Sequence, residues 1–490
     1  MTQVGKTKRE YGLLTMIATI IGIVIGSGIF IKNAGLIETT QSAILSTIGW
    51  LIGGLVVIAM LIAFIEISSI TKKKNEQGTF SSWSKYLWSD KMSKYVGVYF
   101  TFLYFPLVLG EETIFAANEL VGIFDNISLF WMFAITTFLT FVILIAAFMI
   151  NSFSQKPGQR IVSAGTMIKI IPLVSLVLLA VLIFFGVVIQ NGDGAPVTTN
   201  SIFDPNANIN LGLHDDESNF LQVLLILPAI LFAFDGFLFA NSLSTETKKP
   251  STYKTAAIIA ITIITLVYIL FSLSSYMLAD TTLNEDGIMV SDNFGIQPIF
   301  IHIFGESLGK LIGTFIEITI FISIITATFA YSITSMWTLS DYSNINEIRD
   351  INGTLIRRNS AGVPTMAGIK MLTFALIAIV VIRGCDLINI LGILWLVDDG
   401  TNIVNNNNNV DMNSYTSDMT TIMNFSFYTL IIIGGVKNRF TKEVETEKVR
   451  GFFIFSAIAT IIIAFAVLDL AGTVLIGSYN AIDALFNSQN

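Results

Sequence analysis

Residues 17–35 read IATIIGIVIGSGIFIKNAG, an apolar segment with small residues clustered at its centre. Gly26, Ser27 and Gly28 lie where a membrane-spanning helix is farthest from water, and glycine weakens a helix by roughly 1 kcal/mol relative to alanine. The triplet predicts an unwound stretch in the middle of a span. The alternative is close packing against a neighbouring helix, which Gly22 taken with Gly26 would favour equally well.

A second apolar segment, residues 224–243, reads LLILPAILFAFDGFLFANSL and is also interrupted. Pro228 removes one backbone hydrogen bond, and Asp235 and Gly236 follow about two turns later. A carboxylate in the middle of a membrane is unstable without a partner, so we expect Asp235 to face a cavity or a partner. The alternative is a proline kink, with Asp235 bonded to a neighbouring helix.

The composition of the whole chain places it in the membrane class. It has 490 residues, of which 53% are hydrophobic and 13% charged, whereas a soluble domain is about 25% charged. Apolar segments of about 20 residues, the length of one membrane-spanning helix, recur along it. They lie at residues 11–32, 43–66, 95–123, 129–150, 161–189, 219–242, 254–278, 308–337, 367–397, 419–436 and 451–470. The prediction is an all-α polytopic membrane protein with about 11–12 transmembrane helices.

Two parts of the C-terminal third fit this scheme less well. Residues 367–397 are too long for one ordinary span, so they form either one long helix or a span with a short re-entrant piece. After residue 471 the chain is only moderately apolar, so a twelfth span is absent or incomplete.

Basic residues alternate between the linkers, which predicts the topology. Twenty-two of the 27 Lys and Arg residues fall in every second linker, whereas linkers 190–218, 280–297 and 398–418 contain none. Because Lys and Arg are retained on the cytoplasmic side, this asymmetry predicts a cytoplasmic N-terminus, residues 1–10, in the cell membrane.

The two interrupted segments are spans 1 and 6, which run in opposite directions in this topology. Breaks at corresponding positions of two inverted halves indicate the central site of a transporter. We therefore expect a first half at 11–189, a second half at 219–436 and C-terminal spans at 451–490. The half-helix after Gly28 would present free amides to a carboxylate, and the carbonyls that end the first half-helices would accept an ammonium. This combination fits an α-amino acid.

Three motifs resemble those of the amino acid–polyamine–organocation superfamily of permeases. They are GIVIGSGIF at 22–30, FAFDGF at 232–237 and TETKKP at 245–250, and the similarity covers roughly residues 10 to 340. It implies a LeuT-like fold of two inverted five-helix repeats and a secondary active transporter, either a symporter or an exchanger. Gln77 and Gly78 depart from the pair of glycines that the family commonly has after its second helix.

The resemblance also implies roles for residues at the two breaks. Ser27 and Gly28 would bind the substrate carboxylate through their amides, Phe232 would cover the substrate, and Phe329 is a candidate second aromatic lid. The substrate-binding set that we predict is Val24, Gly26, Ser27, Gly28, Phe232, Ala233, Phe234, Asp235 and Gly236, with the carbonyls of Val24, Phe232, Ala233 and Asp235 facing the amino group.

Charged residues inside the spans suggest how transport is driven. Lys169 resembles a helix 5 lysine of sodium-independent relatives, where it would replace the coupling ion or exchange a proton. The alternative is a lysine that extends to the membrane surface, since Arg160 is only nine residues away. Glu111 and Glu112 interrupt span 3. At most one of them faces the lumen of the bundle squarely, unless the helix tilts and both reach outer water.

The charges and the residue types of the chain favour some functional classes and exclude others. Acidic residues outnumber basic ones within the spans, which favours a cationic amino acid or proton coupling. An ion-translocating or proton-translocating subunit without an amino acid substrate remains the alternative. With one cysteine and two histidines, both in predicted outer segments, the chain is not expected to be an enzyme or to bind a metal or another cofactor. No nucleotide-binding loop is present. Expected partners are the amino acid and membrane lipids, with no nucleic acid.

Overall fold

The computed structural model describes residues 13–73, 79–124, 127–187, 219–238, 250–279, 294–398 and 412–487, and each regular element in these ranges is a helix. A helix satisfies its own backbone hydrogen bonds, which lipid cannot do. The elements are α1 (Leu13–Val24), α2 (Gly28–Thr40), α3 (Ala43–Lys73), α4 (Phe80–Leu87), α5 (Asp90–Tyr99), the π-helix η1 (Phe100–Tyr104), α6 (Phe105–Gly122), α7 (Leu129–Phe153), α8 (Gln155–Ile168), α9 (Ile170–Phe184), α10 (Asn219–Leu225), α11 (Leu227–Phe234), α12 (Pro250–Leu278), α13 (Ile296–Phe304), α14 (Glu306–Asn344), α15 (Thr365–Asp398), α16 (Met412–Thr441) and α17 (Phe452–Asn487).

Eight of these helical segments are long and apolar enough to cross a membrane, within the ranges that the structure describes. They are Ala43–Thr71, Asp90–Gly122, Leu129–Phe153, Lys156–Phe184, Tyr253–Leu278, Glu306–Asn344, Thr365–Ile388 and Met412–Thr441. Each overlaps one predicted span. The bent pair α1–α2 counts as a ninth. The chain is therefore a multi-pass membrane protein.

The first predicted span is a broken helix. α1 ends at Val24, α2 begins at Gly28, and the two axes differ by 52°. The break coincides with the Gly26–Gly28 triplet, where helix propensity is lowest. Gly22 behaves differently, because an added Cβ would lie 2.7 Å from Thr166 Oγ1 on α8. Both sequence readings therefore hold, close packing at Gly22 and unwinding four residues later.

The sixth predicted span is also broken. α10 and α11 meet at Ile226, just before Pro228, and α11 ends at Phe234. Asp235 is extended, with φ of −60° and ψ of 158°, and Gly236 has a φ of +85°, which favours glycine. The remainder of the predicted span, after residue 238, and the TETKKP motif up to Lys249 lie outside the described residues.

The third span contains a π-helix that sequence reasoning did not predict. η1 covers Phe100–Tyr104 and lies between α5 and α6. Pro106 is among the first residues of α6, and because it has no amide hydrogen it removes one bond of the regular helical ladder. Single π-turns of this kind often lie at functional sites.

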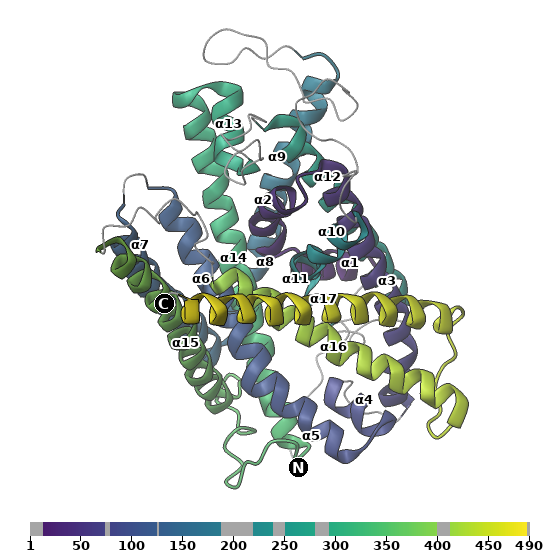
Figure 1. Ribbon diagram of the computed structural model, residues 1–490. Coiled ribbons are helices and arrows are strands. Elements are labelled where there is room, and N and C mark those ends of the chain that lie inside the picture. Colours follow the sequence, from purple (N-terminus) through teal and green to yellow (C-terminus); the bar gives the residue numbers. More distant parts are fainter. Residues whose placement is uncertain are drawn as a thin grey trace.

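The C-terminal helices resolve the two uncertain segments. α15 is one continuous helix from Thr365 to Asp398, so the long-helix reading of 367–397 is confirmed. α17 extends unbroken from Phe452 to Asn487, so residues after 471 continue the same helix. In Figure 1, α17 crosses the front of the bundle and does not run alongside α14. It packs against α3 and α16.

A buried ion pair ties α16 to α3. Arg439 donates from Nε to Glu66 Oε1 at 2.6 Å and from Nη2 to Oε2 at 2.7 Å. The amide of Val449 donates to the same carboxylate at 2.8 Å. Glu66 is only 2% exposed, so this bidentate pair with its added hydrogen bond compensates a charge that water does not reach.

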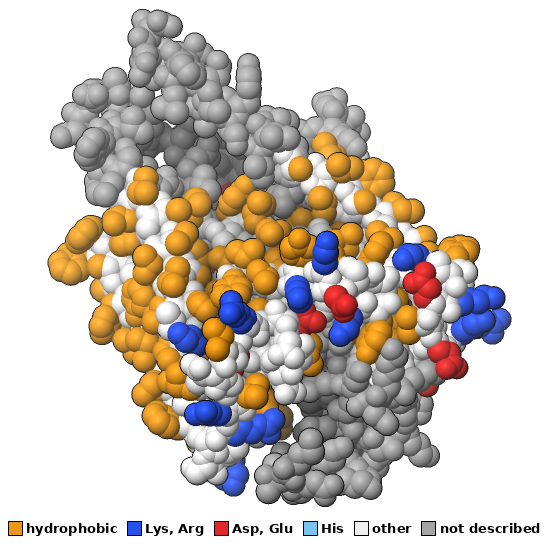
Figure 2. Space-filling model, turned by 90° about the horizontal axis from the view of Figure 1, so that it is seen from below, with side chains coloured by type: hydrophobic (Ala, Val, Ile, Leu, Met, Phe, Trp, Pro, Cys, Tyr) orange, Lys and Arg blue, Asp and Glu red, His pale blue; other side chains and the backbone are white. Residues whose placement is uncertain are grey.

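One end of the molecule carries much of the exposed positive charge. Figure 2 shows the face at the lower end of Figure 1, where Lys and Arg side chains lie among hydrophobic ones with fewer acidic residues. The segment between α14 and α15, which carries Arg349, Arg357 and Arg358, lies at this end. This distribution is the one that the alternating basic linkers predict.

Candidate functional site

The two helix breaks lie against each other. An added Cβ at Gly28 would lie 2.4 Å from the Cα of Ala233, a backbone atom of α11. An added Cβ at Gly236 would lie 3.8 Å from the carbonyl oxygen of Ile23 in α1. Glycine at position 28 therefore allows α2 and α11 to approach more closely than any side chain would permit. The pairing of the breaks places Ser27, Gly28, Ala233 and Gly236 in one site.

The break in the first span offers hydrogen-bond donors. Ser27 begins the new half-helix, since its carbonyl accepts bonds from the amides of Phe30 at 3.0 Å and Ile31 at 3.1 Å. The amides of Ser27 and Gly28, which the sequence predicted as donors, and that of Ile29 donate no hydrogen bond within the described part of the chain. A Cβ at Gly26 would have no neighbour closer than 3.8 Å. Free amides at the positive end of a half-helix, beside this uncrowded glycine, suit a carboxylate.

Lys169 lies at the same break, at the junction of α8 and α9. Its ammonium donates to the carbonyl oxygens of Ile25 at 2.7 Å and Gly22 at 3.0 Å, and the residue is 2% exposed. Its side chain therefore points into the bundle and does not extend to the membrane surface. The ammonium satisfies two carbonyls that the unwound stretch of the first span leaves without helical partners.

Glu112 connects the third span to the break. Its Oε1 accepts a hydrogen bond of 2.9 Å from Ser27 Oγ and lies 3.9 Å from the position of a Cβ on Gly26. Its Oε2 is buried and has no hydrogen-bond partner among the residues that the structure describes. Its neighbour Glu111 points elsewhere, and accepts a bond of 2.8 Å from Thr420 on α16.

The burial of both glutamates corrects one expectation. A tilted helix that brings both carboxylates to outer water is wrong, because Glu111 is 0% and Glu112 4% exposed. The reason is that α6 packs against α7, α14, α15 and α16 at once. Sequence depth alone does not reveal neighbours contributed by distant parts of the chain.

Asp235 is held by three hydrogen bonds from protein groups. Tyr104 donates to Oδ2 at 2.7 Å, and Asn424 and the amide of Gly236 donate to Oδ1 at 3.0 and 2.8 Å. Asp235 therefore joins η1, the break after α11, and α16. This matches the alternative in which Asp235 is bonded to neighbouring helices, and it explains how a carboxylate remains at this depth.

Two of the carbonyls predicted to hold the amino group already accept bonds. Tyr268 on α12 donates to the oxygen of Ala233 at 3.0 Å, and the amide of Asp235 donates to that of Phe232 at 3.1 Å. The carbonyls of Val24 and Asp235 accept no hydrogen bond in the described part of the chain. Phe234 contributes differently, because its buried ring packs against Trp50 and Tyr268.

Lys32 is a functional candidate that sequence reasoning missed. It lies on α2, is 4% exposed and pairs with Asp418 of α16 at 2.8 Å. Its ammonium also lies 5.4 and 5.8 Å from the ring centroids of Phe232 and Phe115. The ring of Phe232 therefore lies beneath a cation, where its π-face is attractive. The signal was a charged residue four positions after Gly28 in an apolar segment.

Phe329 lies on the other side of α14 from the break. Ala327 faces Gly26, and the hydroxyl of Tyr331 faces Gly236. Residue 329 is about 200° around the helix from both of them. Its carbonyl accepts a bond from Asn151 on α7. Its role as a second lid stays a prediction, and Tyr331 is an aromatic side chain of α14 that lies against the break.

Two interrupted helices that meet inside a bundle of membrane-spanning helices, with a buried lysine at one break, define a membrane carrier. The chain belongs to the amino acid permease family, which it matches over residues 11–478. Members of this family are transporters, not enzymes.

Two proteins are similar to this chain in sequence, and one solved structure is similar to it in fold. The chain is 24% identical to the serine/threonine exchanger SteT of Bacillus subtilis over 321 residues. These residues are 65% of this chain and 66% of the exchanger, so the chain spans just under two thirds of that relative. It is 22% identical to an uncharacterised protein of Mycoplasma pneumoniae over 93% of this chain and 82% of that protein. The structural match to the crystal structure of MhsT in complex with L-phenylalanine covers 94% of this chain and 99% of the MhsT chain, with a TM-score of 0.57 and 13% sequence identity. This likeness shows the LeuT-like fold that the sequence predicted.

Proposed function

We propose that this permease carries α-amino acids and binds them at the contact between the two helix breaks. The free amides of Gly28 and Ile29 receive the substrate carboxylate, and the unoccupied carbonyls of Val24 and Asp235 receive its ammonium. The observation that carries this proposal is the contact of Gly28 with Ala233, which brings a donor edge and an acceptor edge together.

The side chain of the substrate meets a carboxylate oxygen. Oε2 of Glu112 is buried without a hydrogen-bond partner in the part of the chain that the structure describes, and a buried acceptor is stabilised when it receives a donor. This favours amino acids whose side chain donates hydrogen bonds. Cationic side chains such as those of arginine, lysine and ornithine fit, and so do the hydroxyls of serine and threonine, which the name of the exchanger from Bacillus subtilis mentions.

Lys169 supports a mode of coupling without a metal ion. Its ammonium already donates hydrogen bonds to the carbonyls of Gly22 and Ile25, which would otherwise be suited to coordinate a bound cation. We propose that transport is independent of sodium and proceeds by exchange or with a proton. Lys169→Ala should abolish uptake, whereas Arg160→Ala, which removes an exposed charge from the neighbouring α8, should leave it nearly unchanged.

Opening and closing involve the pair Lys32–Asp418. This pair connects α2 to α16 and covers Phe232, so it closes the site from that side. In the proposed topology the carrier lies in the cell membrane with its N-terminus in the cytoplasm. The halves 11–189 and 219–436 move against each other during transport. In that orientation Lys32–Asp418 faces outward and the basic face of Figure 2 faces inward.

Uptake of a panel of labelled amino acids into proteoliposomes tests this function. We expect uptake of side-chain hydrogen-bond donors ahead of purely apolar amino acids. Stimulation by an inward proton gradient would identify a symporter, and uptake only after preloading would identify an exchanger. No uptake under any condition would contradict the proposal, and proton conductance without amino acid would favour the ion-translocating alternative.

A further inference from the structure

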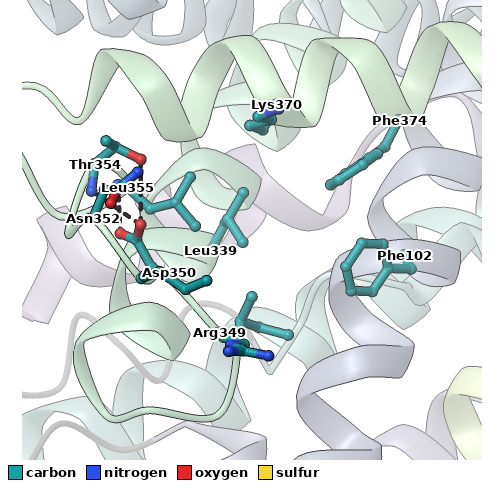
Figure 3. Close-up of a pocket in the computed structure, with 11 residues that line it drawn as sticks. Phe102, Leu339, Arg349, Asp350, Asn352, Thr354, Leu355, Lys370 and Phe374 are labelled. Carbon is teal, nitrogen blue, oxygen red and sulfur yellow. Dashed lines mark hydrogen bonds between the residues drawn. The ribbon is translucent and has the colours of Figure 1, made fainter.

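A cavity of about 410 Å³ lies at the basic face, far along the chain from the helix breaks. It is open to the surface and is lined by the end of α14, the segment between α14 and α15, the start of α15, and η1. Figure 3 shows its two kinds of wall. Phe102 and Phe374 lie side by side at one end, and Arg349 and Lys370 approach from opposite sides.

The loop that forms the polar wall is organised around Asp350. Its carboxylate accepts hydrogen bonds from the amides of Leu355 at 2.7 Å and Thr354 at 3.0 Å, and from the hydroxyls of Thr354 and Ser343, both at 3.2 Å. Desolvation acts to raise the pKa of Asp350, but these bonds outweigh it and hold the pKa below its ordinary value. The one acidic side chain of the wall therefore already accepts hydrogen bonds from its own loop and from Ser343 of α14.

The basic side chains of the wall have no such partners. Arg349 and Lys370 are exposed, and neither forms an ion pair within the described residues. The nearby carboxylate of Glu347 accepts a hydrogen bond from Ser93 instead. Arg358 lies over the ring of Trp337, 4.8 Å from its centroid. Two positive charges therefore face the cavity against the one negative charge of Asp350, so the wall carries a net positive charge.

The apolar wall opens onto a surface of exposed apolar side chains. The rings of Phe102 and Phe374 have their centroids 4.9 Å apart, and Phe102 is 44% exposed. Further exposed apolar side chains continue this surface along α5, η1 and α15, namely Val98, Leu103, Ile369 and Ile377. Lys370 lies five residues into α15, about 7.5 Å from its start, which is the depth of a membrane interface.

We propose that this cavity binds one anionic phospholipid from the leaflet at the basic face. Arg349 and Lys370 hold the phosphate from two sides, and an acyl chain leaves over Phe102 and Phe374. Anionic headgroups bind basic pockets between transmembrane helices on the cytoplasmic side, which is the side that the proposed topology assigns to this face. Lipid binding itself does not depend on which amino acid is carried, or on whether one is carried.

The test is a lipid titration of the full-length protein in detergent, with bound lipids counted by native mass spectrometry. Phosphatidylglycerol should bind as one tight copy, and phosphatidylcholine should not. Because each basic residue near a membrane surface contributes about five-fold, Arg349→Gln with Lys370→Gln should weaken this copy roughly thirty-fold. Phe374→Ala should weaken it while leaving the charge intact.

Lys156→Gln with Arg357→Gln is the matched control, because it removes the same charge from the same face outside the cavity. An equal loss of phosphatidylglycerol in the control would overturn the proposal, as would wild-type protein that binds both lipids alike. Displacement of the lipid by inorganic phosphate at equal concentration would also overturn it, since the site would then recognise the ion alone. Thermal melting of each variant verifies that it is folded.

Discussion

Gly28 permits the contact between the two helix breaks, so replacing it with alanine tests the site directly. The added Cβ would lie 2.4 Å from Cα, 2.7 Å from Cβ and 2.9 Å from N of Ala233. Ordinary contact needs at least about 3.4 Å, so α2 and α11 would have to separate by about 1 Å. Backbone atoms cannot rotate away as a side chain would, so both half-helices must move.

The magnitude follows from that displacement. Overpacking by one methyl group costs typically about 1–3 kcal/mol of unfolding free energy. A misplacement of about 1 Å at a site that depends on orientation reduces the rate by about a hundred-fold. We therefore expect Gly28→Ala protein to be folded but to show initial uptake into proteoliposomes reduced by one to two orders of magnitude.

Gly35→Ala is the control on the same helix. Nothing lies within 4 Å of the Cβ it would add, and alanine favours a helix by about 0.5–1 kcal/mol over glycine. Its uptake should match that of the wild-type protein, with equal or higher thermal stability. If the initial uptake of the Gly28→Ala protein is within two-fold of the wild-type rate, the close contact is not needed for transport. The proposed geometry of the site would then be wrong.

Three further predictions concern stability. Arg439→Gln should lower the unfolding free energy by about 3–5 kcal/mol, because it leaves the buried charge of Glu66 uncompensated. Tyr104→Phe should lower it by about 1.5–3 kcal/mol, because it removes one hydrogen bond to the carboxylate of Asp235. Asp350→Asn should destabilise the protein at neutral pH, and the difference from wild type should disappear in acid. Since the pKa of Asp350 is lowered, its contribution is present above pH about 4 and is lost as the pH falls through that lowered pKa.

Denaturation in detergent measures all three, with a separate comparison for each. Lys254→Gln breaks the more exposed pair Lys254–Glu447 and should cost no more than about 1 kcal/mol, so an equal effect of Arg439→Gln would contradict the role of burial. Tyr95→Phe changes an exposed tyrosine and should have no effect. A difference for Asp350→Asn that persists unchanged at pH 2 would show that its charge is not the cause.

The helix breaks were predictable because their causes are local. Glycine, serine and proline weaken a helix at their own positions, so the interruptions at Gly26–Gly28 and near Pro228 follow from the sequence. Their mutual contact followed from the inverted topology, which the basic linkers indicate. The continuity of α15 was left open because length alone does not distinguish a long helix from a re-entrant one.

The side-chain environment was less predictable because it depends on helices distant in sequence. Lys32 pairs with Asp418, and Glu111 with Thr420, both on α16, and nothing near either residue in the chain indicates the partner. The direction in which Phe329 points depends on how α14 is rotated about its axis. Because α14 has apolar residues on all its sides, the sequence does not indicate that rotation. The π-helix η1 had one local signal, Pro106, which is compatible with several kinds of irregular helix.

The lysine at the first break has a consequence for energy. An ion bound at such a place enters from one compartment and leaves into the other, and the work stored in its gradient is thereby transferred to the cargo. In the proposed function the ammonium of Lys169, attached to the chain between α8 and α9, replaces a metal ion at that position, so only its proton could be released there. A neutral amino acid would then cross without net current unless a proton travels with it, and a cationic one would follow the membrane potential. Voltage clamping of the reconstituted carrier therefore distinguishes these modes.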